Sequence, residues 1–234
     1  CKSLKKVIFL NPSSVKSIGN GAFKECSSLT KIIIPSSVKT ILYKSFYKCT
    51  SLEEILLPDS LDRIADYAFS ECESLKKIKF PPSLDSIANN IVSKCTSLTE
   101  IIIPSSAANI GVESFAGCSS LKEIMIPSSV TKIKKKAFTN CSSLKQITIP
   151  LSVTLIGNEV FCHCKSLERV EILASIESIP SKLFFECSSL IEIVIPSSVK
   201  SIDSFSFKNC KSLKQLSIPP NVEIIKNQAF CGCS

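Results

Sequence analysis

Residues 26–48 read CSSLTKIIIPSSVKTILYKSFYK, and Cys49 then begins the same pattern again. Cysteine recurs with a 23-residue period from Cys26 to Cys233, and only the first interval, from Cys1 to Cys26, is slightly longer. The chain therefore consists of ten successive units, with almost no sequence outside them. A fixed period of about 20 to 50 residues indicates a solenoid in which each unit forms one coil.

The apolar positions within each unit are nearly constant when its first cysteine is counted as position 0. Position 3 is Leu and position 15 is Ile in every unit, while position 20 is Phe in every unit except one, which carries Val92, once the two extra residues of the first unit around residues 9–12 are left out of the count. A single unit is too short to bury all of these side chains by itself, whereas stacked neighbours can cover one another. We therefore predict a continuous core along the stack, with Phe138 at position 20 buried between coils.

Local patterns predict mainly β structure. Leu-x-x-Ile-x-Ile alternates with period two and is rich in β-branched residues, which is typical of a short strand. Pro-Ser-Ser follows it and predicts a turn, and the stretch that ends Ala-Phe-x-x-Cys predicts a helical or 3₁₀ turn. Equivalent strands should pair in parallel at a spacing of about 4.8 Å, so ten coils should form a rod or a shallow arc.

Composition agrees with one folded repeat domain over residues 1–234. The apolar content of 44% is ordinary for a folded soluble protein, and no segment has the apolar length of a membrane span. Solenoids usually carry polar caps that cover the core at their ends, and neither end of this sequence resembles one. We therefore expect the chain to be a fragment of a longer repeat protein.

The thirteen cysteines allow two interpretations. They could form the disulfide framework of an extracellular protein, or they could be a ladder of buried thiols, one in each coil. The ladder is favoured, because a disulfide framework does not require a 23-residue register and core packing does. Cys162 and Cys231 lie outside the ladder and are predicted to be exposed thiols. Cys162-His163-Cys164 lacks the paired spacing of zinc motifs, so we predict neither a metal nor a cofactor.

The sequence gives little support for a catalytic function. His163 is the only histidine, and the sequence contains neither a Gly-rich phosphate loop nor a nucleophile elbow. We therefore predict that the protein is not an enzyme.

Charge is uneven along the chain. Residues 1–50 contain nine Lys and one acidic residue, whereas residues 51–117 contain five basic and ten acidic residues. The densest basic cluster comprises Lys132, Lys134, Lys135 and Lys136. It could steer a polyanionic surface toward the chain, or it could simply be a solvated face. Nucleic acid is a poor candidate, because no aromatic platform for base stacking accompanies these lysines.

The repeated pattern Leu-x-x-Ile-x-Ile-Pro-x-x-Val-x-x-Ile-x-x-x-Ala-Phe-x-x-Cys resembles the BspA-like leucine-rich repeats. That family occurs in surface proteins of mucosal microbes. The resemblance implies a leucine-rich repeat fold with a concave strand sheet. It also implies a place at the cell surface or outside the cell, and adhesion to host matrix or to other cells. It implies no catalytic residues.

The outer face of the strands is the predicted binding face. Positions 6 and 8 face the core, so position 7 must point outward. The predicted partner-binding residues at position 7 are Ile33, Leu56, Lys79, Ile102 and Met125. Position 5 beside them is polar or charged in every unit, and an apolar row with a polar rim is typical of an interaction surface. Alternatively, β-branched residues stand there only because strands favour them.

Two functions follow from these patterns. The first is a binding or adhesion module that uses the outer strand face to dock a protein partner. The second is a structural spacer, or a self-associating rod, that has no specific ligand.

Overall fold

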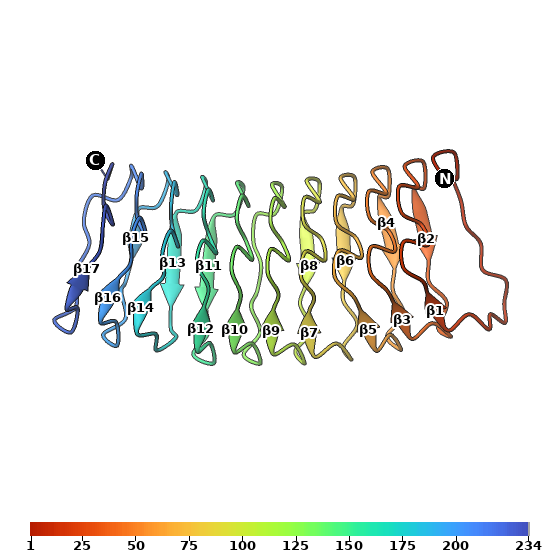
Figure 1. Ribbon diagram of the computed structural model, residues 1–234, viewed down its shortest axis with the longest axis horizontal. Coiled ribbons are helices and arrows are strands. Elements are labelled where there is room, and N and C mark those ends of the chain that lie inside the picture. Colours follow the sequence, from red (N-terminus) through yellow and green to blue (C-terminus); the bar gives the residue numbers. More distant parts are fainter. Residues whose placement is uncertain (234) are drawn as a thin grey trace.

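The computed structural model describes residues 1–233, which form a row of stacked coils with the two chain ends at opposite ends of the row (Figure 1). Each 23-residue unit makes one coil, and the row bows only slightly. This solenoid confirms the repeat fold predicted from the cysteine period. The described residues contain β strands and turns, and no α-helix or 3₁₀ helix is present among them.

Each coil contributes up to two short strands. The first row of strands comprises β2 (Lys31–Ile33), β4 (Glu54–Leu56), β6 (Lys77–Lys79), β8 (Glu100–Ile102), β11 (Gln146–Ile149), β13 (Arg169–Ile172) and β15 (Glu192–Ile193). The second row comprises β1 (Ser17–Ile18), β3 (Thr40–Ile41), β5 (Arg63–Ile64), β7 (Ser86–Ile87), β9 (Asn109–Ile110), β10 (Lys132–Ile133), β12 (Leu155–Ile156), β14 (Ser178–Ile179), β16 (Ser201–Ile202) and β17 (Ile224–Ile225). All pairs are parallel, and each residue faces its equivalent in the next unit, as Ile32 faces Ile55.

The two rows of strands are interrupted at different coils. The first row breaks between β8 and β11, because residues 123–126 form no strand, yet the second row is continuous there through β9, β10 and β12. The second row breaks between β5 and β7 and between β12 and β14, where β4–β6 and β11–β13 remain paired. Every pair of neighbouring coils therefore keeps at least one parallel ladder.

The stretch before each cysteine forms hydrogen-bonded turns, as predicted, but these turns do not join into a 3₁₀ helix or an α-helix. Positions 18 and 22 of every coil have a left-handed backbone, as at Lys136 with φ 58° and Asn140 with φ 59°. A left-handed residue cannot continue a right-handed helix. The N–H groups of Lys136 and Asn140 instead donate to the carbonyls of Asn158 and Cys162 on the next coil, at 3.0 and 2.8 Å. These bonds between coils alternate with bonds inside the turn, such as the bond from the Thr139 N–H to the Lys136 carbonyl at 3.1 Å.

Phenylalanine at position 20 forms a stack through the core. Phe138 is fully buried, and its ring lies 5.2 Å from that of Phe115 and 5.7 Å from that of Phe161. The stack is interrupted at Val92, but the same coil carries buried Ile91 and Phe80. The burial predicted for Phe138 is confirmed.

The cysteine ladder is buried, and its cysteines form no disulfide bonds. Nine ladder cysteines, from Cys26 to Cys210, are buried, and every cysteine of the chain is a free thiol. The Cys141 thiol donates to the carbonyl of Phe115 on the neighbouring coil, with 3.2 Å between Sγ and the oxygen. The equivalent bond recurs from Cys49 to Cys233. The small thiol therefore both fills the core and ties adjacent coils together.

Burial changes the acidity of these thiols. It raises the pKa of Cys141 to about 12, and it raises the pKa of the equivalent thiols in neighbouring coils. Seven ladder thiols share this behaviour: Cys72, Cys95, Cys118, Cys141, Cys164, Cys187 and Cys210. A thiol with so high a pKa stays protonated near neutral pH and is a poor nucleophile.

The prediction that Cys162 is an exposed thiol is wrong. Only 4% of Cys162 is accessible to solvent, and burial raises the pKa of its thiol to about 11. Its position, 21, is also buried at Ser93 and Thr139, because the turns of adjacent coils cover it. Cys231 occupies the same position and is exposed as predicted, since no following coil lies over it in the described residues.

Gly157 marks a close approach between two coils. A methyl group there would overlap the backbone of the preceding coil, with the carbonyl carbon of Lys134 only 2.8 Å away. We expect Gly157→Ala to lower the free energy of unfolding by about 1–3 kcal/mol, as overpacking usually does. Chemical denaturation followed by circular dichroism would measure this change.

Gly19 provides the matched control, because it occupies the same repeat position and has no atom within 4 Å of an added methyl group. Gly19→Ala should leave stability unchanged or raise it by up to about 1 kcal/mol. Equal destabilisation by both substitutions would contradict the close approach at Gly157.

Candidate functional site

The outer face of the first row of strands presents a line of exposed side chains at position 7. Ile33 is 56% exposed and Met125 is 83% exposed, and Leu56, Lys79 and Ile102 are also exposed. The parallel register sets Ile33 beside Leu56 and Lys79 beside Ile102. The structure therefore turns all five predicted partner-binding residues toward solvent. Their role in binding stays a prediction.

Charged residues at position 5 border this line. The Lys31 ammonium lies 2.7 Å from the Glu54 carboxylate, and the Lys77 ammonium lies 2.6 Å from the Glu100 carboxylate. The parallel register creates both pairs, because it places equivalent positions of neighbouring units side by side. Exposed pairs of this kind contribute only about 0–1 kcal/mol each to stability. Their main effect is to neutralise charge over β2 to β8.

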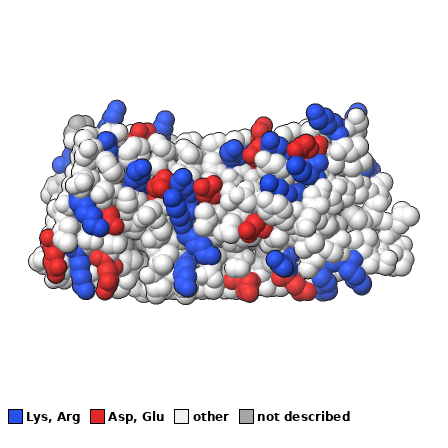
Figure 2. Space-filling model, in the orientation of Figure 1, with Lys and Arg blue, Asp and Glu red and all other residues white. Residues whose placement is uncertain are grey.

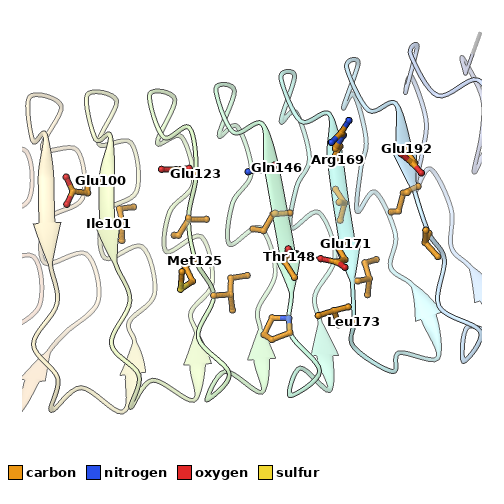
Figure 3. Close-up of a pocket in the computed structure, with 18 of the residues that line it drawn as sticks. Glu100, Ile101, Glu123, Met125, Gln146, Thr148, Arg169, Glu171, Leu173 and Glu192 are labelled. Atoms are coloured by element: carbon orange, nitrogen blue, oxygen red, sulfur yellow. Dashed lines mark hydrogen bonds between the residues drawn. The ribbon is translucent and has the colours of Figure 1, made fainter.

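A shallow groove of about 1040 Å³ hollows the same face further along the chain. It extends across β8, residues 123–126, β11, β13 and β15. Figure 3 shows its labelled side chains in two lines. One line consists of Glu100, Glu123, Gln146, Arg169 and Glu192 at position 5, and the other contains Met125, Thr148 and Glu171 at position 7. Of the predicted partner-binding residues, only Met125 lines the groove.

Sequence reasoning missed this groove. The outward row turns polar at Thr148 and Glu171, and a search for apolar residues therefore favours the N-terminal half of the face. The shape of the groove depends on how the coils stack, and no single unit encodes that. The excess of acidic residues at position 5 from Glu100 to Glu192 was the available signal.

The groove begins where the first row of strands is interrupted. The backbone N–H and C=O groups of residues 123–126 make no hydrogen bond to either adjacent coil. Ile124 and Ile126 still point into the core and are 9% and 7% exposed. The same positions of the coils on either side, in β8 and β11, are paired in ladders.

The groove is acidic although the whole chain carries a formal net charge of +8. Its lining contains four glutamates and one cationic residue, Arg169, and since Glu100 is paired with Lys77 outside the groove, Glu123, Glu171 and Glu192 carry its acidic charge. Glu171 accepts a hydrogen bond from the Thr148 hydroxyl at 3.2 Å. Neither Glu123 nor Glu192 has an ion-pair partner within residues 1–233. These two carboxylates are available to a cation from outside the chain.

The predicted basic cluster is partly neutralised. The ammonium groups of Lys135 and Lys136 both lie 3.6 Å from the carboxylate of Glu159 on the next coil. Lys132 and Lys134 are exposed on either side of buried Ile133. Figure 2 shows a column of Lys and Arg side chains across the middle of one face, with acidic side chains interspersed around it. The cluster is therefore a smaller cationic feature than four adjacent lysines imply.

The donors of Cys162-His163-Cys164 do not converge on one point. The His163 ring lies 3.0 Å from the Glu186 carboxylate, whereas the Cys164 thiol points inward to the Phe138 carbonyl. Within residues 1–233, no group of three or more His, Cys, Asp or Glu side chains is placed to hold a metal ion. The same described residues include no helix that is both long and apolar enough to cross a membrane.

Stacked coils with parallel strands, each built from a short repeat with a constant Leu at position 3, define a leucine-rich repeat protein. The family model of the BspA type leucine rich repeat region matches residues 1–122 and 108–234, so the chain belongs to that family. Comparison with curated proteins finds no match.

Several solved bacterial structures are similar to this chain. A leucine rich cell surface protein from Faecalibacterium prausnitzii is 28% identical, with a TM-score of 0.53, over 94% of this chain and 74% of that one. A leucine rich repeat protein from T. pallidum is 29% identical, with a TM-score of 0.57, over 77% of this chain and 74% of that one. The pneumococcal vaccine antigen PcpA has a TM-score of 0.60 at 24% identity, over 93% of this chain and 54% of that one, and this likeness shows the fold alone.

Proposed function

We propose that this chain is a protein-binding or adhesion module of a cell-surface or secreted protein, and that it acts without enzymatic chemistry. The observation that carries the proposal is the exposed line of Ile33, Leu56, Ile102 and Met125, of which the first three stand on strands paired in parallel ladders. Exposed apolar side chains rimmed by polar ones mark interaction surfaces. The relative from Faecalibacterium prausnitzii is described as a cell surface protein, which supports the proposed location.

The partner that this face fits is another protein, such as a host matrix or cell-surface protein. A rigid row of outward side chains can be ordered before binding, so little conformational entropy is lost on association. The ion pairs along the rim leave the first half of the face almost neutral, and an apolar surface of this kind does not require a charged partner. A spacer or self-associating rod remains the alternative function.

We expect a combined Ile33→Lys and Ile102→Lys variant to fold normally and to lose protein binding. Both side chains point into solvent, so two ammonium groups there disturb the surface and not the core. Binding would be measured by biolayer interferometry against a panel of immobilised extracellular matrix proteins. Sedimentation velocity would measure self-association of the same samples.

The control variant, Leu155→Lys with Ile224→Lys, adds the same charge to exposed residues of the second row of strands. It should bind as the unmodified chain does. Unfolding of the Ile33 and Ile102 variant would show that the side-chain assignment is wrong. A folded variant with unchanged binding would show that the exposed line at position 7 is not the binding site. If the unmodified chain binds no matrix protein and stays monomeric, the structural spacer becomes the favoured function.

A further inference from the structure

We infer that the groove over β8 to β15 binds an extended segment of a partner protein in which basic and apolar side chains alternate. This inference rests on the proposed protein-binding function and names the chemistry of the segment that the face recognises. It also places that contact further along the chain than the line from Ile33 to Ile102.

The length of the groove suits a short extended segment. Adjacent coils are about 4.8 Å apart, so the four steps from Glu100 to Glu192 cover about 19 Å. An extended chain rises about 3.3 Å per residue, and about six residues would therefore span the groove along the solenoid axis. A segment of this size can contact both lines of side chains shown in Figure 3.

The apolar part of the groove accounts for the apolar side chains of such a segment. Met125 and Val194 are 83% and 71% exposed at the two ends of the position 7 line. Leu173 adds a third exposed apolar side chain to the lining. Covering these surfaces would remove apolar area from water, which stabilises a complex by about 25 cal/mol for each Å².

The charge of the groove accounts for the basic side chains. Glu123 and Glu192 have no ion-pair partner within the described part of the chain, and Glu171 is held only by the Thr148 hydroxyl. Lysine or arginine side chains at alternate positions of a bound segment would reach these carboxylates. An acidic segment would meet repulsion from the same carboxylates, and specificity for a basic partner follows.

The test uses fluorescein-labelled, terminally capped six-residue peptides and fluorescence anisotropy with the intact chain. The probe has the sequence Lys-Leu-Lys-Val-Lys-Leu, and the matched peptides replace every Lys by Glu or every apolar residue by Ser. We expect only the first peptide to bind well, with an affinity that falls as salt is raised. Substituting three groove glutamates by glutamine, as Glu123→Gln, Glu171→Gln and Glu192→Gln, should weaken its binding at least about tenfold, which corresponds to about 1.4 kcal/mol.

The matched control makes the same change of charge outside the groove, as Glu25→Gln, Glu177→Gln and Glu223→Gln. It should change affinity less than about twofold, since carboxylates far from the groove act only through screened long-range charge. Circular dichroism of both variants verifies that each is folded. Equal weakening by the two variants, equal binding of the Glu peptide, or no binding of the Lys peptide would overturn the inference.

Three further outcomes separate this inference from the proposed function. If matrix proteins bind and the groove variant binds them unchanged, the groove inference fails while the proposed function stands. If the Lys peptide binds in the groove but no matrix protein binds the chain, the groove inference stands and the wider proposal fails. If the groove variant abolishes self-association of a chain that ignores the Lys peptide, the occupant is a second copy and the inference is wrong.

Discussion

Raising the pH from 8 to 10 is expected to lower the free energy of unfolding by about 10 kcal/mol or more, which is enough to unfold the chain. The cause is a set of seven buried ladder thiols whose pKa values are raised by burial, to about 12 at Cys141. In the unfolded chain the same thiols titrate near their ordinary pKa of about 8.5. Between these two values the folded protein keeps protons that the unfolded chain releases, so stability falls as pH rises.

The magnitude follows from the number of thiols. Each thiol that is protonated in the folded state and ionised in the unfolded state lowers the free energy of unfolding by about 2 kcal/mol at pH 10. Seven ladder thiols behave in this way. We therefore expect the protein to unfold at a pH that an ordinary domain without buried thiols tolerates. Guanidinium titrations at a series of pH values, under reducing conditions, would measure the slope.

Cys141→Ala isolates the contribution of one thiol. The variant should be less stable near neutral pH, because it loses the hydrogen bond to the Phe115 carbonyl. Above pH 9 its stability should fall less steeply than that of the unmodified chain, by one proton or about 1.4 kcal/mol per pH unit. A stability that is flat from pH 8 to pH 10 would show that the ladder thiols are not buried as the structure has them.

Phe138→Ala is expected to lower the free energy of unfolding by about 3–5 kcal/mol, the usual effect of removing a buried aromatic ring. The ring is fully buried and stacks on Phe115 and Phe161, so its removal opens a cavity between two coils that neither neighbour can fill. Coupling in repeat proteins is mostly between neighbours, and the loss should therefore appear first as exchange of amide hydrogens in the coils beside Phe138.

Phe205→Ala is the control for this substitution, because Phe205 is only half-buried at position 18 and lies outside the stack. Its removal should cost clearly less than the removal of Phe138. A change below about 1 kcal/mol for Phe138→Ala would contradict the core register, since a ring without tight contacts could be lost at that small cost.

Much of the core was predictable because the repeat fixes it. The 23-residue period requires equivalent side chains to stack, and the alternation around Ile32 and Ile34 separates inward from outward positions. Both conclusions depend only on the periodic spacing of residues, which is visible in the sequence itself. The exposure of Ile33 and the burial of Phe138 follow from it, and the structure confirms both.

The turns were not predictable in the same way. The residues in left-handed conformation at positions 18 and 22 are mostly not glycine, with Glu159 and His163 as examples. Their strain is offset by hydrogen bonds to the next coil, such as the bond from the His163 N–H to the Phe185 carbonyl at 2.7 Å. Local sequence patterns do not include a partner on the next coil, and they therefore favoured a helical turn.

The sequence by itself determined the solenoid, the register of its strands, the buried stack of Phe and Cys, and the outward direction of position 7. Each of these features depends on residue positions that recur along the ten units of the chain. Only the tertiary structure decided the burial of Cys162, the staggered interruption of the two rows of strands, and the acidic groove. The interruptions and the groove arise where adjacent coils differ from one another, whereas Cys162 is buried because the turns of adjacent coils cover its position. Contacts between coils, not the pattern within one unit, decide all three features.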